Sequence, residues 1–269
     1  TINGLFYDIS NFSVLDYVGG LEDLEAGLVR VIGDPDERYR EDPVRMIRAV
    51  RHAARLGFRV EEKSWEAIGR KRGLLGDCSK ARLMEEFYRD LRGGASVETF
   101  RLMLQAGLLQ ELLPELAEIF PMDRPEALSW KRLAVLDGDI EDGERIGNPV
   151  LLGLLFAYPL TEHLRRLSEG GKRPDYGRAA YRYLKPLTTR LGVSRRDTEQ
   201  LFLISISQRR MLPYLDGEGS IPRFLRSKGY FPDALRLLRM EAAARGVDLG
   251  ELRFSSSGRR RGRRRRRRG

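Results

Sequence analysis

The segment from Arg38 to Phe58, with the sequence RYREDPVRMIRAVRHAARLGF, constrains the fold most because it sets a ladder of arginines in a helical pattern. One acidic residue and three arginines recur at every third position, and at about 100° per residue they stay on one side of a helix. The opposite side is apolar, as in a surface helix that packs on a core. We therefore expect a helix over residues 41–56. Its polar ladder consists of Asp42, Arg45, Arg48 and Arg51.

The helical pattern continues beyond this segment, and glycine and proline residues separate its parts. Breakers such as Gly57, Pro121 and Gly192 mark helix ends, because glycine and proline disfavour a helix interior. The pattern predicts an all-helical chain after the first segment. The further helices are expected at residues 62–71, 79–92, 96–106, 109–119, 125–136, 148–157, 160–168, 174–191, 195–207, 220–227 and 231–245.

The first 35 residues have a different pattern, with short runs rich in β-branched and aromatic side chains. Residues 3–9 and 13–18 predict a hairpin, residues 21–26 a short helical turn, and residues 28–32 a third strand. Three short strands bury too little apolar surface to be stable alone. We therefore expect this region either to lean on the first long helix or to be frayed.

The positive charge of the chain is concentrated at its C-terminal end. The 269 residues carry a formal net charge of +10, and nine arginines lie between positions 259 and 268. From Ser255 onward there is no apolar residue to bury, so we expect a disordered tail. Such a tail can bind RNA phosphates, or polyanions without specificity. The candidate RNA-binding residues are Arg259, Arg260, Arg261, Arg263, Arg264, Arg265, Arg266, Arg267 and Arg268.

The remaining composition favours a cytoplasmic protein with an ordinary core. The chain is 41% hydrophobic, which suffices for a core at this length. A single cysteine, Cys78, cannot form an internal disulfide, and two histidines do not make a zinc site. No run of about 18 apolar residues occurs, so we expect no membrane association.

The ladder has three interpretations. Asp42 followed by Pro43 is typical of an N-cap and a first-turn proline, and a basic helix face is often merely solvated. A carboxylate beside a guanidinium can also recognise adenine or cytosine, since each base places an amino donor next to a ring-nitrogen acceptor. Uracil and guanine would leave both protein groups unpaired, at a cost of about 1 to 3 kcal/mol. The arginines that follow, Arg48 and Arg51, could then neutralise a triphosphate or an RNA backbone.

The run RYREDPVRMIRAVRHAARLGF, preceded by TINGLFYDI and DYVGGLEDL, closely resembles the class II nucleotidyltransferase family. This family comprises bacterial poly(A) polymerases and CCA-adding tRNA nucleotidyltransferases. Thr1–Leu5 resembles the end of its RRDFTxNAL motif, Asp16–Leu24 its DxxGGxxDL motif, and Glu41–Arg45 its EDxxR template. The segment RYREDPVRM resembles the corresponding segment of the poly(A) polymerase branch of the family.

The resemblance implies roles for individual residues. Asp42 and Arg45 would read the base, and Asn3 would make a polar contact near the bound triphosphate. The run SKAR with two following glutamates resembles the neck motif of the family, so Arg82 would contact nucleotide or RNA. The alternative for Arg82 is an i,i+4 ion pair with Glu86. Asp16 and Asp23 flank a glycine pair, where a turn and a cap are the simpler interpretation.

The resemblance also implies what this chain lacks. The metal-binding carboxylates of the family lie in a DxD strand upstream of the TIN motif, so we expect Mg²⁺ ligands outside this chain and no activity for the chain alone. The expected fold class is mainly α, with a remnant of a small α/β nucleotidyltransferase head. The expected regions are residues 1–38, the edge of the head; residues 39–95, a nucleotide-reading and RNA-binding neck; residues 96–254, a helical body; and residues 255–269, the tail.

The function implied is the template-independent addition of AMP from ATP to RNA 3′ ends, in mRNA or tRNA. The nearest alternative is a CCA-adding enzyme. An alternative of another class is a non-catalytic helical module that binds RNA. The sequence gives no prediction of protein partners.

Overall fold

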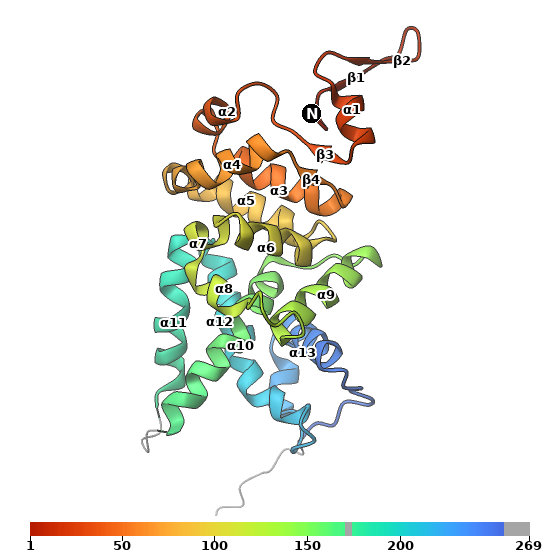
Figure 1. The fold of residues 1–269 in the computed structure, drawn as a ribbon. Helices are drawn as coiled ribbons and strands as arrows, with labels where there is room; N and C mark the ends of the chain where they lie inside the picture. Colours follow the sequence, from red (N-terminus) through yellow and green to blue (C-terminus); the bar gives the residue numbers. More distant parts are fainter. Residues whose placement is uncertain (170–173, 256–269) are drawn as a thin grey trace, which may run out of the picture.

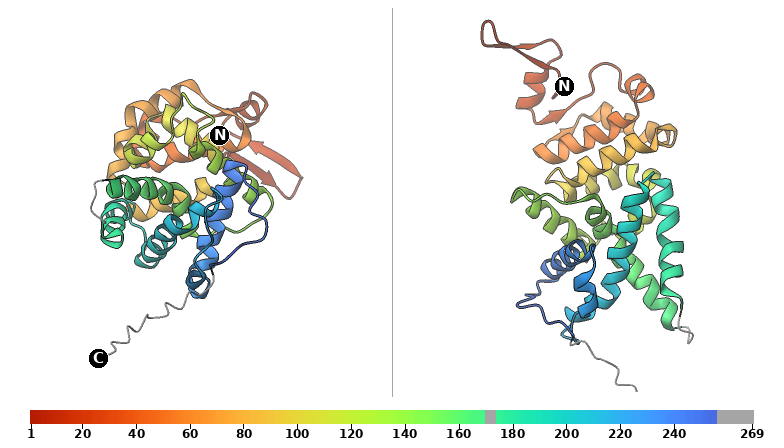
Figure 2. Two further views of the ribbon diagram at one scale, coloured as in Figure 1. Left: turned by 90° about the horizontal axis from the view of Figure 1, so that it is seen from below. Right: turned by 180° about the vertical axis from the view of Figure 1, so that it is seen from behind.

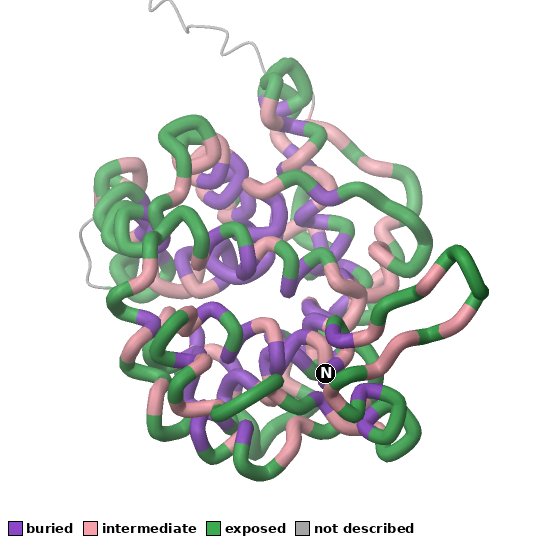
Figure 3. Tube along the Cα trace, turned by 90° about the horizontal axis from the view of Figure 1, so that it is seen from above, coloured by how far each residue is buried: buried purple, intermediate pink, exposed green. Residues whose placement is uncertain are grey.

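The computed structural model describes residues 1–169 and 174–255, which form a small β-containing end and a stack of helices (Figure 1). The first strands, β1 (Leu5–Asp8) and β2 (Ser13–Asp16), pair antiparallel as the expected hairpin. The hairpin extends away from the helices and is mostly exposed (Figure 3). A short helix, α1 (Gly20–Glu25), follows at the predicted helical turn.

The third strand does not join the hairpin. β3 (Leu28–Val29) is shorter than expected and pairs in parallel with β4 (Arg59–Val60), which the sequence pattern did not predict. This pairing connects the β-containing end to the end of the arginine helix. The strand β3 therefore leans on the end of that helix, as expected, whereas the hairpin of β1 and β2 extends away from the helices.

The arginine ladder lies on two helices instead of one. α2 spans Pro35–Glu41 and α3 spans Val44–Leu56, so the single helix expected over residues 41–56 is wrong at its start. Asp42 is extended, with φ −147° and ψ 90°, because a residue before proline is pushed out of the helical region. Pro43 begins α3 without a side-chain cap, so the N-cap interpretation of Asp42 is also wrong.

The middle of the chain forms short helices, most of which lie below α3 in Figure 1 (see also Figure 2). α4 (Glu62–Lys71) leads through the 3-10 segment η1 (Arg72–Asp77) into α5 (Lys80–Leu91). α6 (Ser96–Gln105) packs against α3. The expected helix at 109–119 is divided by Pro114 into α7 (Leu108–Leu112) and α8 (Pro114–Ile119). α9 spans Leu128–Glu141.

The remaining helices form the lower bundle. α10 (Asn148–Glu169) runs unbroken through Pro159, so the two helices expected at 148–157 and 160–168 are one. α11 (Tyr176–Arg190), α12 (Arg195–Met211) and α13 (Phe231–Arg245) surround it, with the 3-10 segments η2 (Leu212–Tyr214) and η3 (Arg223–Ser227) between the last two. The apolar side chains of these helices form a core continuous with that under α3. The buried residues lie mostly toward the middle of the molecule in Figure 3.

The fold is therefore mainly α, as the sequence predicts. Among residues 1–169 and 174–255, no helix is both long and apolar enough to cross a membrane.

Candidate nucleotide-binding site

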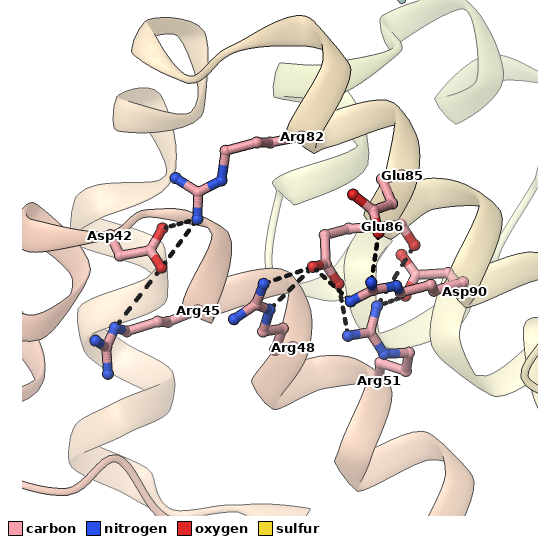
Figure 4. A network of polar contacts seen from close by, with 9 residues as sticks. Asp42, Arg45, Arg48, Arg51, Arg82, Glu85, Glu86 and Asp90 are labelled. Carbon is pink, nitrogen blue, oxygen red and sulfur yellow. Dashed lines mark hydrogen bonds and ion pairs between the residues drawn. The ribbon is translucent and has the colours of Figure 1, made fainter.

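The carboxylate of Asp42 lies between two guanidinium groups (Figure 4). Arg82 Nη2 donates to both carboxylate oxygens, at 3.0 and 3.2 Å, and Arg45 Nε lies 4.0 Å from Oδ2. The Asp42 side chain is 20% exposed, whereas both arginines are about half exposed. The alternative i,i+4 pair between Arg82 and Glu86 is wrong, because Arg82 crosses from α5 to Asp42 instead.

The next two arginines of the ladder converge on one buried carboxylate. Arg48 donates to Glu86 Oε1 through Nε at 3.0 Å and Nη2 at 2.7 Å, and Arg51 Nη2 lies 2.6 Å from Oε2. Arg51 Nη1 also donates to Asp90 Oδ1 at 2.9 Å. The Arg48 side chain remains 41% exposed, but that of Arg51 is only 8% exposed. Along α3, the arginine side chains of the ladder therefore change from partly exposed, at Arg45 and Arg48, to buried, at Arg51.

The two acidic groups of this cluster respond differently to burial. Burial by itself would raise the pKa of Glu86, but the hydrogen bonds from Arg48 and Arg51 outweigh it and hold this pKa below its usual value. Burial raises the pKa of Asp90 to about 7, because its attraction to Arg51 offsets only part of the lost hydration and Glu86 repels it. Glu86 is thus the anion that holds both arginines, and Asp90 supports only Arg51.

A hollow of about 260 Å³ lies between the β-containing end and α3. It brings together three residues that the sequence selected, Asn3, Arg45 and Arg48, although they lie far apart in the chain. Asp42 does not line the hollow itself, but it contacts Arg45, which does. Arg51 does not line the hollow, because its guanidinium is held behind α3 by the two carboxylates.

Two further residues of the hollow were missed by the sequence reasoning. His52 lies on α3 beside Arg48, and the helical period that selected the ladder could have found it. Burial and the neighbouring arginines lower the pKa of His52, so the imidazole is neutral at pH 7. Arg30 follows β3, and its Nη2 lies 2.8 Å from Asp23 Oδ1, a long-range pair that no sequence pattern signals.

The acidic residues around the glycine pair have structural contacts. Asp16 accepts hydrogen bonds from the backbone N–H groups of Val18 and Leu21, at 3.0 and 2.8 Å, and so holds the turn before α1. Asp23 is buried against Arg30. These contacts agree with the turn interpretation of the glycine pair. Within the described ranges no group of three or more His, Cys, Asp or Glu side chains is placed to hold a metal ion.

The predicted RNA-binding arginines of the tail, between positions 259 and 268, lie outside the described residues. Of the predicted RNA-binding residues, the structure therefore places only Arg82, in the contact with Asp42 described above.

Comparison with known proteins gives two matches to family models. One, described as "Poly A polymerase head domain", covers residues 1–30, and one, described as "Probable RNA and SrmB- binding site of polymerase A", covers residues 57–120. Poly(A) polymerase I of Escherichia coli O6:H1 is 41% identical over 63% of this chain and 37% of its own length. Poly(A) polymerase I of Haemophilus influenzae is 34% identical over 94% of this chain and 56% of its own length.

The fold has a solved counterpart. The Bacillus stearothermophilus CCA-adding enzyme, solved in complex with CTP, matches with a TM-score of 0.62 at 19% identity, over 93% of this chain and 54% of that one. At this identity the match establishes the fold alone. The chain spans between about a third and somewhat more than half of the length of these relatives.

Proposed function

Because the chain belongs to the family of poly(A) polymerases and CCA-adding enzymes, we propose that it supplies the base-reading side of an enzyme that adds AMP from ATP to RNA 3′ ends. The proposal includes the division given above, with residues 1–38 as the edge of the head, 39–95 as the neck, 96–254 as the body and 255–269 as an RNA-binding tail. It also includes mRNA or tRNA 3′ ends as the RNA substrate.

The observation that carries the proposal is the contact between Asp42 and Arg45, because Arg45 lines the hollow. The carboxylate of Asp42 can accept the amino group of adenine, while Arg45 donates to the adjacent ring nitrogen. Arg82 does not prevent this, because a carboxylate offers about four acceptor sites and Arg82 Nη2 uses two. Arg82 fixes the direction of the carboxylate, which is what selective reading requires.

The triphosphate would lie along the accessible arginines of the hollow. Arg48 is 41% exposed and lines the hollow with Asn3, so it can turn one guanidinium edge to phosphate oxygens. We assign Arg51 a supporting place instead of a direct contact, because Glu86 and Asp90 occupy its donors. Mg²⁺ would bind carboxylates outside this chain, where it would activate the RNA 3′-hydroxyl and stabilise the leaving pyrophosphate.

A CCA-adding enzyme is the second candidate, and its support is specific. Cytosine presents the same amino donor and ring-nitrogen acceptor as adenine, so the same pair of residues would accept both. The fold is also shared with a CCA-adding enzyme solved with CTP. Supplying tRNA that lacks CCA, or a generic RNA, with each single nucleotide would separate the two activities.

The proposal is tested by Asp42→Asn in the enzyme joined to its catalytic segment. We expect the preference for ATP over UTP to fall about 5- to 150-fold, which corresponds to about 1 to 3 kcal/mol of lost discrimination. Thermal stability should change little, because Asp42 caps no helix through its side chain. Glu37→Gln is the matched control, since Glu37 lies on α2 five residues before Asp42, outside the EDxxR segment, and is exposed. Unchanged preference in Asp42→Asn would remove the base-reading role.

A further inference from the structure

One side of α11 is basic and has no ionic partner. The helix contains four cationic residues and no Asp or Glu. Arg178, Arg182 and Lys185 are exposed and recur at spacings of four and three, so they share one side. Tyr181 lies among them and is 54% exposed. We call these four residues the basic stripe. In the part of the chain that the structure describes, its three cations form no ion pair.

The stripe differs from the basic surface of the neighbouring helix. On α10, Arg165 and Arg166 are also exposed, but each lies 2.8 Å from a carboxylate oxygen of Glu162. Most exposed arginines of a folded protein are neutralised in this way or are solvated singly. Three unpaired cations with an exposed tyrosine between them are a different arrangement, because they attract anions and offer a ring for stacking.

The stripe leads to the base-reading residues. α11 ends beside the start of α5, where Lys80 Nζ donates to the carbonyl oxygen of Thr189 at 3.3 Å. Two residues further along α5, Arg82 contacts Asp42. Figures 1 and 2 show α11 running from this junction down the outside of the helical bundle. A hollow of about 640 Å³ follows the same edge and is lined by Tyr181, Lys185 and Thr189 among others.

We propose that the basic stripe binds the single-stranded RNA that precedes the 3′ end being extended. The phosphates would contact the three cations and a base would stack on Tyr181, which is how strands are held without sequence preference. This inference rests on the proposed function for the identity of the RNA. From Arg178 to Thr189 the helix rises about 16 Å at 1.5 Å per residue, so only an RNA longer than the few nucleotides at the base-reading site reaches it.

The first test compares two triple variants of the 269-residue chain. Arg178→Gln, Arg182→Gln and Lys185→Gln remove the charges of the stripe. The matched control removes the same net charge elsewhere, through Arg165→Gln, Arg166→Gln and Arg239→Gln. Because both variants keep the C-terminal arginines, the contribution of those arginines cancels in the comparison.

Binding of fluorescent oligoadenylate is measured by anisotropy over a range of salt concentrations. For a long oligoadenylate, we expect the plot of log binding constant against log salt concentration to be less steep by about 2 for the stripe variant than for the control variant. Each phosphate contact on a single strand contributes about 0.7 to this slope. For an oligoadenylate of a few nucleotides we expect no difference. Tyr181→Ala should weaken binding of the long RNA at least about fivefold, whereas Phe224→Ala, at another exposed aromatic, should not. Equal slopes for both triple variants would overturn the proposal.

The second test locates the RNA without using a variant. Acetylation of Lys185 is followed by mass spectrometry with and without saturating oligoadenylate, and exposed Lys131 on α9 is the internal control. We expect the RNA to reduce the acetylation of Lys185 and to leave that of Lys131 unchanged. Equal labelling of Lys185 in both conditions would place the RNA elsewhere.

The two proposals fail in different ways. If Lys185 is protected but the catalytic enzyme transfers no AMP, the stripe stands and the proposed function falls. If AMP is transferred and the stripe variant matches its control with long RNA, the function stands and the stripe falls.

Discussion

Glu86→Gln tests whether one buried carboxylate organises the arginines of α3. Glu86 is 3% exposed; its Oε1 accepts hydrogen bonds from Arg48 at 2.7 and 3.0 Å, and its Oε2 forms an ion pair with Arg51 Nη2 at 2.6 Å. An amide keeps the shape but replaces one acceptor oxygen by a donor, which then faces a guanidinium. Arg51 then retains Asp90 as its ion-pair partner and a hydrogen bond of 3.4 Å to the carbonyl oxygen of residue 86.

The magnitude follows from this burial. Removing one partner of a buried ion pair costs about 3 to 5 kcal/mol, because the other charge stays desolvated. The remaining contact with Asp90 places the expected loss near the lower end, at about 3 kcal/mol. For a protein whose stability is about 5 to 15 kcal/mol, this is a large change. Urea denaturation of the 269-residue chain, followed by circular dichroism, measures it as a lower midpoint at unchanged slope.

The control is Glu85→Gln, one residue earlier on α5. Glu85 is 62% exposed and pairs only with the half-exposed Arg89, so its loss should cost at most about 1 kcal/mol. If Glu86→Gln lowers the midpoint no more than Glu85→Gln does, Glu86 does not organise the cluster.

Three further outcomes are expected. Burial raises the pKa of Asp90 to about 7, from about 3.9 in the unfolded chain. Between these values the folded chain binds a proton that the unfolded chain does not, so the free energy of unfolding falls as pH rises from about 4 to about 7. In Asp90→Asn, the urea midpoint should decline less over this pH range. Gly153→Ala on α10 should destabilise the chain by about 1 to 3 kcal/mol, because the new methyl group would lie 3.0 Å from Leu237. Gly69→Ala on α4 would meet nothing within 4 Å and should stabilise the chain by about 0.5 to 1 kcal/mol. Thermal melts of both variants measure these changes. A chain ending at Phe254 should bind RNA with a log–log salt slope shallower by as much as about 6, and equal slopes would mean that the tail does not touch RNA.

The helical periodicity of the sequence predicted the arginine ladder but could not assign its contacts. It placed Arg45, Arg48 and Arg51 on one side of a helix, and all three lie on α3. It could not show that Arg51 is buried, because that depends on Glu86 and Asp90 of α5, which are distant in the chain. A helical period gives the direction of a side chain, and the partner is set by packing.

Proline was informative in one place and misleading in another. Pro43 excludes helical geometry at the preceding residue, so the break at Asp42 was available in the sequence. Pro159 suggested a second break, yet α10 continues through it. There the helix is buried among its neighbours, and the packing outweighs the loss of one backbone hydrogen bond. The two-residue strands β3 and β4 are too short to give any alternating pattern.

The close approach of Gly192 to Lys80 limits which residue can follow α11. Gly192 has φ +65°, and a Cβ at this position would lie 2.9 Å from Lys80 Cβ, so the turn after α11 lies directly against the start of α5. A larger residue would force this turn away from α5 and disturb the hydrogen bond from Lys80 Nζ to the carbonyl oxygen of Thr189. Glycine is thus the residue that lets the end of α11 approach the helix that carries Arg82.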